Sequence, residues 1–230
     1  MAEGAGRMAL VAGGSGLVGG KLLSVLLSAP EYSRVQALSR RPLPLDHPRL
    51  ANRVLRFDAA FETQLKGLRC QDVYCCLGTT RREAGSQDAL RAVDLELVLK
   101  FARFAASAGA ERFSVVSAVA AEAASRNFYL RAKGEMEQAL EGLRFGALDI
   151  LQPSLLLGSR RDPRPLELIA QPVMRLINPL LLGRWSRYRA IEAGTVALAM
   201  YGAARSGRRG VNRYTYEAMR TLARSAAGVN

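Results

Sequence analysis

A tyrosine and a lysine four residues apart are the side chains of this sequence best placed to carry chemistry. Tyr129 and Lys133 lie in a segment, Phe128 to Leu140, whose pattern predicts a helix, so both side chains share one helix face. A tyrosine titrates at about pH 10 in water, and a neighbouring ammonium stabilises its phenolate, which lets it exchange a proton nearer neutrality. Ser117 ends an expected strand twelve residues earlier and can hold a carbonyl oxygen in line with the tyrosine. These residues predict a proton-transfer site for a carbonyl substrate.

The composition adds weight to this pair, because the same spacing also arises by chance. Of the 33 basic residues only four are lysines, at positions 21, 66, 100 and 133. An excess of arginine beside abundant alanine and glycine is typical of a coding bias. A lysine at position 133 goes against that bias, which favours a functional pair over two ordinary helix residues.

A glycine-rich turn near the start of the chain is suited to bind a phosphate group. The apolar run Met8 to Ala12 has the length of a buried strand, and Lys21 to Leu27 has the pattern of a helix. Gly13, Gly16 and Gly19 recur between them and permit a tight turn, while the helix start offers free N–H groups to a pyrophosphate. Glycine turns also end many strands without binding anything. The strand before and the helix after favour a dinucleotide site here.

The tip of the next strand indicates which dinucleotide is bound. Arg34 to Leu38 predicts this strand, and Ser39, Arg40 and Arg41 follow it with no acidic residue. A carboxylate at this tip would bind the 2′-hydroxyl of NAD, whereas arginines grip the 2′-phosphate of NADP. We therefore expect NADP(H), with two ordinary surface arginines as the alternative.

The formal net charge of +13 does not by itself predict a nucleic-acid-binding protein. The arginines are spread along the chain without a block of like charges, and aromatic residues make up only 7%. Specific recognition would require a clustered basic stripe, and single-strand binding would require stacking aromatics. We expect a solvated basic surface and no specific nucleic-acid partner.

Few residues could hold a metal or form a disulfide framework. The single histidine, His47, lies in a proline-rich loop, which excludes a histidine-rich metal site and disfavours a Ser-His-Asp hydrolase. The three cysteines are odd in number, and Cys75 and Cys76 are adjacent on an expected buried strand, as in a reduced, cytoplasmic protein. No apolar run reaches the roughly 18 residues that span a bilayer, and no signal peptide is evident.

Strands alternate with helices along the chain, which predicts an α/β fold with a doubly wound parallel sheet covered on both faces. The expected strands are Met8 to Ala12, Arg34 to Leu38, Arg53 to Phe57, Asp72 to Leu77, Phe113 to Ser117 and Ala147 to Leu151. The expected later helices are Asp88 to Ser107, Phe128 to Leu140, Ile191 to Tyr201 and Tyr216 to Ala226.

These motifs in this order resemble the short-chain dehydrogenase/reductase superfamily. The glycine spacing, Ser117 and Tyr129-x-x-x-Lys133 carry the resemblance, which covers residues 8–158 well and the remainder loosely. The segments Cys75 to Arg81 and Asn127 to Glu135 resemble more narrowly its atypical branch of Tat-interacting-protein-like oxidoreductases. The resemblance implies a Rossmann fold over residues 1–230, NADPH binding and a Ser117, Tyr129 and Lys133 triad. It also implies that residues 159–230 supply a small substrate-binding or lid portion.

The resemblance also implies which residues contact the cofactor. The backbone at Leu17 and Val18 would hold the pyrophosphate, Asp58 with Ala59 would meet the adenine, and Pro153 would lie near the nicotinamide. The full expected set is Gly13, Ser15, Gly16, Leu17, Val18, Gly19, Ser39, Arg40, Arg41, Asp58, Ala59, Leu77, Gly78, Thr79, Lys133 and Pro153. The chain departs from the superfamily at Asp94, where many members carry an asparagine that serves the usual proton relay.

Two functions fit these observations. The first is an NADPH-dependent oxidoreductase that transfers a hydride to or from a carbonyl substrate. The apolar segment Leu166 to Trp185 is expected to form a helix packed over the active site, with an apolar pocket or a membrane-surface contact as the alternative. Its apolar lining suggests a hydrophobic substrate. The second is a non-catalytic NADPH-binding redox sensor that docks a partner protein, since members of this branch are proposed to act as regulators. We expect a monomer or a homodimer in either case.

Overall fold

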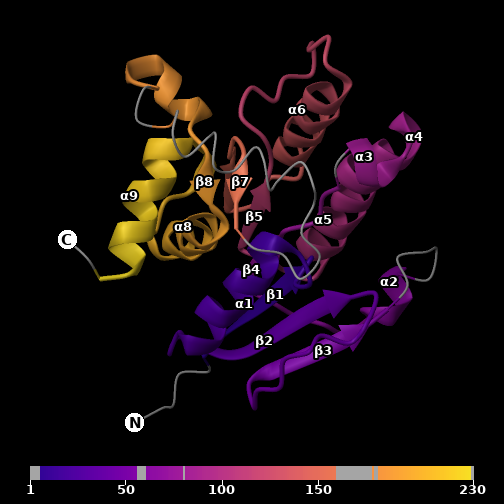
Figure 1. Cartoon of the computed structure of the whole chain (residues 1–230). Helices are drawn as coiled ribbons and strands as arrows, with labels where there is room; N and C mark the ends of the chain where they lie inside the picture. Colours follow the sequence, from indigo (N-terminus) through magenta and orange to yellow (C-terminus); the bar gives the residue numbers. More distant parts are fainter. Residues whose placement is uncertain (1–5, 56–60, 80, 159–177, 179–180, 229–230) are drawn as a thin grey trace.

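The chain forms a parallel sheet with helices on both faces (Figure 1). The structure, a computed structural model, describes residues 6–55, 61–79, 81–158, 178 and 181–228. Among these residues the main sheet has seven strands in the order β3-β2-β1-β4-β5-β6-β9, and every pairing is parallel. The strands are β1 (Arg7–Ala12), β2 (Tyr32–Ser39), β3 (Leu50–Val54), β4 (Asp72–Cys75), β5 (Arg112–Val116), β6 (Ala147–Leu151) and β9 (Gly210–Tyr214). This confirms the predicted fold class.

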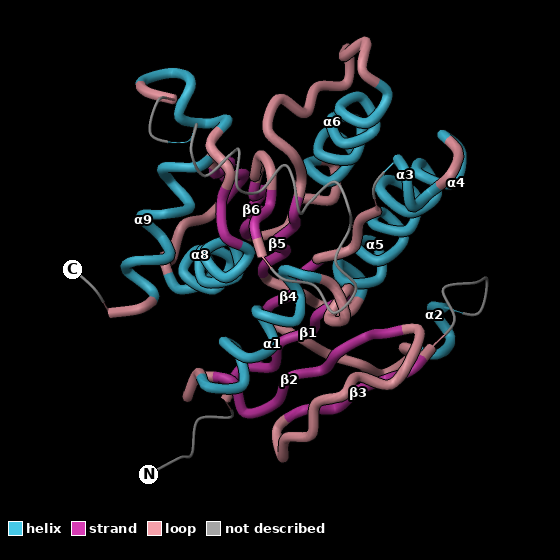
Figure 2. Tube along the Cα trace, viewed as in Figure 1, coloured by secondary structure: helices cyan, strands magenta, loops and turns pink. Residues whose placement is uncertain are grey.

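Alternate residues of the strands enter two separate hydrophobic cores. In β1, Ala9 and Val11 point into one core, and Leu10 and Ala12 point into the other. This alternation is the pleat of a strand buried on both faces. The first core is closed by α1 (Leu17–Ser28), α8 (Ala193–Arg205) and α9 (Tyr216–Ala226), and the second by α5 (Val98–Ser107) and α6 (Phe128–Glu141). Figure 2 shows these two helical layers on either side of the sheet.

The order of the strands reverses between β1 and β4, and this point locates the site. The chain winds from β1 outward through β2 to β3, and then returns to place β4 on the other side of β1. The connections that follow β1 and β4 therefore run to opposite faces of the sheet, where α1 packs against one core and α5 against the other. Ligands of open α/β sheets bind at this position.

The expected helix from Asp88 to Ser107 is one continuous helical segment with three parts. It begins as α4 (Gln87–Arg91), widens into a π-helix (Ala92–Leu97) and continues as α5. A π-helical turn is rare and frequently marks a functional site. Here it carries Asp94, which is fully buried. The periodicity predicted the helix and contained no sign of the wider turn.

Both outer strands differ from the sequence predictions. The third strand lies at Leu50–Val54, earlier than the expected Arg53 to Phe57, whose last two residues are outside the described part of the chain. The seventh strand, β9, was not predicted. Both lie at an edge of the sheet and are partly exposed, so they lack a continuous apolar run.

The last part of the chain packs against the first core. β7 (Leu156–Leu157) and β8 (Ile191–Glu192) form a small parallel pair, and α8 lies against α1. The expected helix at Ile191 therefore begins two residues later than predicted. The 3₁₀ helix Gly183–Tyr188 carries an exposed Trp185. The rest of the apolar segment that begins at Leu166 is largely outside the described residues. Two further short helices are α2 (Phe61–Gln64) and α3 (Arg81–Ala84).

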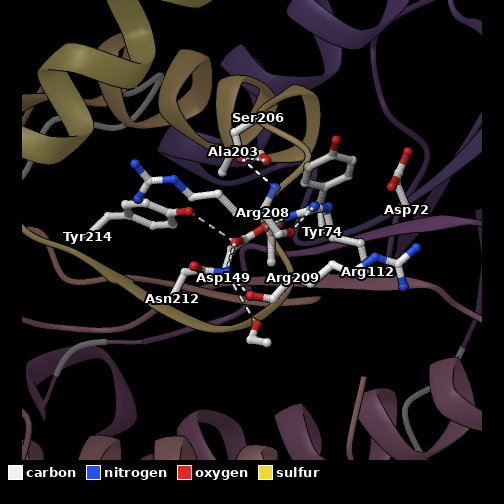
Figure 3. A network of polar contacts seen from close by, with 12 residues as sticks. Asp72, Tyr74, Arg112, Asp149, Ala203, Ser206, Arg208, Arg209, Asn212 and Tyr214 are labelled. Carbon is white, nitrogen blue, oxygen red and sulfur yellow. Dashed lines mark hydrogen bonds and ion pairs between the residues drawn. The ribbon is translucent and has the colours of Figure 1, made fainter. Parts of the chain in front are cut away.

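A buried polar network joins three strands away from the carboxyl edge (Figure 3). Arg112 at the start of β5 places Nη1 2.5 Å from Oδ2 of Asp149, a carboxylate in the middle of β6. Tyr214 and Asn212 of β9 donate hydrogen bonds to Oδ1 of Asp149, each at 3.3 Å. Arg112 also donates to the Arg208 carbonyl at 2.7 Å, which attaches the loop before β9. The network satisfies a buried carboxylate and links β5, β6 and β9.

Candidate active site

The glycine turn after β1 is closed so tightly that side chains would not fit. Gly13 has φ +85°, and a Cβ there would lie 2.5 Å from the Cys76 carbonyl oxygen at the end of β4. A Cβ on Gly19 would lie 2.2 Å from the Gly13 oxygen. The Gly16 N–H donates to the same Gly13 oxygen at 2.9 Å. The turn is thus pressed against β4, and Ser15 and Gly16 remain exposed at the start of α1.

The tip of β2 is held by a residue that sequence reasoning did not identify. Ser39 is buried and donates its hydroxyl to the Arg41 carbonyl at 2.7 Å. Asn52 of β3 donates to the Ser39 oxygen at 2.8 Å and accepts from the Leu43 N–H at 2.8 Å. These bonds fold the loop after β2 back onto β3. Arg40 and Arg41 are left exposed at the strand tip, whereas the Ser39 hydroxyl is used within the fold.

Tyr129 and Lys133 occupy the first turns of α6, as predicted. Asn127 caps this helix by accepting from the Tyr129 and Leu130 N–H groups at 3.0 and 3.2 Å, which fixes where the helix begins. Lys133 is almost fully buried, and its Nζ donates to the Val116 carbonyl at the end of β5 at 3.3 Å. The lysine therefore lies under the carboxyl edge of the sheet.

Asp94 connects this lysine to the loop after β4. Its Oδ1 lies 2.8 Å from Lys133 Nζ, and both side chains are at most 3% exposed. Its Oδ2 accepts from the Thr79 N–H at 2.8 Å. A Cβ on exposed Gly78 would come within 3.3 Å of Asp94 Oδ1 and 3.7 Å of Lys133 Nζ, so the ion pair lies directly below that glycine. One carboxylate thus binds both the Gly78–Thr79 turn and the lysine.

This arrangement sets the ionisation of the tyrosine and the lysine. Burial raises the pKa of Tyr129, Lys133 lowers it, and Asp94 raises it again, with a net upward shift. Burial lowers the pKa of Lys133, but Asp94 and Tyr129 raise it by more, so the net shift is also upward. Tyr129 is therefore a neutral phenol and Lys133 an ammonium at neutral pH.

Ser117 contacts a second buried carboxylate that the sequence did not identify. Its hydroxyl donates to Oε1 of Glu137, which lies on α6 one turn beyond Lys133. Gln152, just after β6, donates its amide to both Glu137 oxygens at 3.0 Å, and Arg213 of β9 lies 3.4 Å from Oε2. The four-residue step from Tyr129 to Lys133 to Glu137 was visible in the sequence, and it places all three side chains on one face of α6.

The remaining expected contacts follow the carboxyl ends of strands along the chain. Val18 and Pro153 are buried, and Leu77 is half-buried where β4 ends. The backbone at Gly158 lies against Leu17, since a Cβ there would be 3.1 Å from the Leu17 side chain. Asp58 and Ala59 are outside the described residues. The structure thus brings the glycine turn, the Gly78–Thr79 turn and the Tyr129–Lys133 pair to one edge of the sheet.

Comparison with known proteins identifies the family. Protein HTATIP2 of Rattus norvegicus is 34% identical over 198 residues, which cover 84% of this chain and 79% of that protein. The chain belongs to the HTATIP2 and FMP52 family. FMP52 of Coccidioides immitis is 30% identical over 210 residues, 82% of this chain and 85% of that protein. This confirms the narrower resemblance to Tat-interacting-protein-like proteins that was read from the motifs. No protein-family model matches the sequence.

Solved structures confirm the fold. MoeE5 in complex with UDP-glucose and NAD has a TM-score of 0.67 and 16% identity, and covers 96% of this chain and 82% of its own. A UDP-glucose 4-epimerase from Thermotoga maritima has a TM-score of 0.69 and 15% identity. The match covers 97% of this chain and 83% of that epimerase chain. At these identities the likeness shows the fold alone, a Rossmann-like α/β fold.

The family corrects the expected location. The fungal FMP52 relatives are named mitochondrial, including that of Saccharomyces cerevisiae, which is 34% identical over 157 residues. The names of these relatives therefore contradict the cytoplasmic expectation. That expectation rested on free cysteines, which indicate only a reducing environment and do not distinguish one such compartment from another. No helix within the described residues is long and apolar enough to cross a membrane.

Proposed function

We propose that the chain is an NADPH-dependent oxidoreductase that reduces a carbonyl group, with Tyr129 as the proton donor. The observation that carries this proposal is the position of the Tyr129–Lys133 pair. The lysine ammonium lies beneath Gly78 at the carboxyl edge of the sheet, beside the strand-order reversal where this fold binds its ligands. A buried ammonium with a tyrosine one helical turn away at this place supports proton transfer better than a purely structural role.

The residues at this edge of the sheet fit a nicotinamide dinucleotide. The turn at Gly13 and Gly19 leaves no room for a Cβ, and such a turn brings backbone N–H groups close to a pyrophosphate. Arg40 and Arg41 are exposed at the tip of β2 without an acidic neighbour in the strand, which supports NADP(H) over NAD(H). A reduced nicotinamide, when bound, supplies the hydride that reduces a carbonyl carbon.

The side chains of the chain itself provide the other parts of the reaction. The Tyr129 phenol gives its proton to the carbonyl oxygen, which becomes the hydroxyl of the product, and the tyrosine is left as a phenolate. The Lys133 ammonium stabilises that phenolate until it regains a proton from water. Ser117 would orient the carbonyl only after its hydroxyl turns away from Glu137.

Replacing Tyr129 with Phe tests this proposal. The ring remains and only the transferable proton is lost, so turnover should fall by about 10²–10⁴-fold while NADPH affinity stays nearly unchanged. The measurement is NADPH oxidation with a panel of aldehydes, ketones and quinones, including hydrophobic ones, together with a cofactor titration. Wild-type turnover retained by the Phe variant would contradict the role of Tyr129.

One pair of observations favours a second candidate, a non-catalytic NADPH-binding sensor that docks a partner protein. Asp94 forms an ion pair with the Lys133 ammonium, and Glu137 accepts a hydrogen bond from the Ser117 hydroxyl. Both triad groups are therefore occupied by carboxylates in this conformation. Tight NADPH binding without reduction of any carbonyl in the panel would support the sensor over the enzyme.

A further inference from the structure

Asp94 and Lys133 form a buried ion pair beside Tyr129. It joins two elements far apart in the sequence, a π-helical turn and α6, and each of its side chains is at most 3% exposed. The same carboxylate accepts from the Thr79 N–H in the turn that lies above the pair. A π-helical turn at this point widens the helix locally where Asp94 reaches both partners.

We propose that Asp94 is a positioning residue that fixes the charge state of the proton-transfer pair. It holds Lys133 as an ammonium and keeps Tyr129 as a neutral phenol, so the site is set to give a proton to a carbonyl oxygen rather than to take one from an alcohol. This inference rests on the proposed oxidoreductase function for its consequence, but the charge state itself is a property of the protein alone.

Among the described residues, the charged and titratable groups that act on the pair come from the π-helix, α6 and β4. Three such groups act on Lys133. They are Asp94 on the π-helix, Tyr129 on α6 and Cys75 on β4. Burial raises the pKa of the Cys75 thiol to about 12, so it stays neutral. Asp94 is therefore the anion that offsets the burial of the lysine. It also counteracts the effect of Lys133 on Tyr129, because a negative charge disfavours formation of a phenolate.

The consequence is a preferred direction of reaction at neutral pH. Carbonyl reduction needs the phenol O–H, whose bond breaks as the proton passes to the carbonyl oxygen. Alcohol oxidation needs the phenolate, which accepts the alcohol proton while the hydride passes to an oxidised nicotinamide. Because Asp94 favours the phenol, reduction should proceed at neutral pH and oxidation should require a more alkaline solution.

The decisive experiment is a titration of the pair by NMR without substrate or cofactor. Seven tyrosines and four lysines make selective ¹³C labelling of both residue types practical, and Tyr129→Phe identifies the Tyr129 signal. In Asp94→Asn, which keeps the size of the side chain, the pair should release its first proton at a pH at least about one unit lower than in the wild type. The tyrosine and lysine signals together report that step, whichever of the two loses the proton.

A matched control is available on the same helical turn. Glu96 is exposed and lies 4.0 Å from Arg91, so Glu96→Gln removes one carboxylate without touching the pair and should leave the titration unchanged. If Asp94→Asn fails to fold, Asp94→Ser carries the same test. An unchanged midpoint in a folded Asp94 variant would overturn the proposal. Loss of the fold in both variants would also overturn it, since Asp94 would then be structural.

Kinetics separate this inference from the proposed function. With any carbonyl that the wild type reduces, the pH profile of the reverse oxidation should move to lower pH in Asp94→Asn by the same amount as the NMR midpoint. If no carbonyl is reduced, the oxidoreductase proposal fails, whereas the titration still decides the role of Asp94. A shifted midpoint of the NMR titration together with an unshifted pH profile of alcohol oxidation would overturn the assigned direction of reaction.

Discussion

Single hydrogen bonds decide what the predicted triad can do in this protein. Ser117 donates its proton to Glu137, so its oxygen can only accept a hydrogen bond from a ligand in this conformation. An acceptor suits an alcohol, whereas a carbonyl oxygen needs a donor. Glu137 is itself held by Gln152 and Arg213, so reorienting Ser117 means breaking one bond of a buried cluster. Residue types alone therefore do not show whether Ser117 donates a hydrogen bond to a ligand or accepts one from it.

The proposed preference for NADPH can also be tested at the scale of single residues. Changing both Arg40 and Arg41 to Ala should weaken NADPH binding much more than NADH binding, because only NADPH carries the 2′-phosphate that guanidinium groups grip. Fluorescence titration of each cofactor against the wild type and the double variant measures this difference. Equal losses for the two cofactors would contradict the NADP assignment.

At the scale of elements, the start of α1 shows how closely the glycine turn after β1 and the helix pack against each other. Gly19 and Gly20 are adjacent in the same helix, yet their surroundings differ. A Cβ on Gly19 would strike the Gly13 oxygen at 2.2 Å, whereas one on Gly20 would make an ordinary contact with the Gly14 oxygen at 3.5 Å. The clash involves backbone on both sides, so it cannot be relieved by turning a side chain.

This pair of glycines gives a matched prediction. Gly19→Ala should lower the free energy of unfolding by about 1–3 kcal/mol through overpacking and should weaken cofactor binding, because the turn must open. Gly20→Ala should be neutral or stabilising by up to about 1 kcal/mol, since alanine favours the helix. Urea unfolding and cofactor titration of both variants test this. Equal effects of the two changes would show that the turn is not tightly closed.

At the scale of the whole molecule, the Arg112–Asp149 pair links β5 and β6, on the other side of the sheet from β2 and β3. Burial raises the pKa of Asp149, and Arg112 lowers it. Removing the arginine would leave a buried carboxylate without its cation. Stability here depends on contacts among β5, β6 and the loop before β9, which come from distant parts of the sequence.

Arg112→Met should lower the free energy of unfolding by about 3–5 kcal/mol at pH 7. Without Arg112 the pKa of Asp149 in the folded state rises further above its unfolded value, so the folded state binds the proton more tightly. The contribution of Asp149 to the free energy of unfolding is then present at low pH, and it is lost as the pH rises through the pKa of Asp149 in the folded state. The loss should therefore be smaller at pH 5 than at pH 7 in urea unfolding.

A control for this variant is Arg208→Met. It removes a nearby exposed charge but keeps the backbone carbonyl that accepts from Arg112, so its effect should stay within about 0.5 kcal/mol. A large loss in Arg208→Met, or a loss in Arg112→Met that does not vary with pH, would show that the buried pair is not the source of stability.

The sequence by itself determined the elements that follow from local geometry. Short apolar runs and a periodicity of 3.6 residues predict the strand–turn–helix at Gly13, the helix that carries Tyr129 and Lys133, and the bounds of β6 and α9. These patterns record which face of an element is apolar, and the two cores of the sheet confirm them. The family could likewise be inferred from the motifs, because they combine fixed spacings with that order of elements.

Only the tertiary structure decided which buried groups meet. Asp94 and Lys133, or Ser117 and Glu137, come from elements whose packing sets their separation, and no local pattern encodes that distance. The strand β9 escaped prediction because an exposed edge strand needs no apolar run, and it is defined by its pairing with β6. The π-helical turn at Asp94 is likewise formed where a buried carboxylate must reach two partners at once. The ionisation of Tyr129 depends on these contacts because charge interactions act through space rather than along the chain.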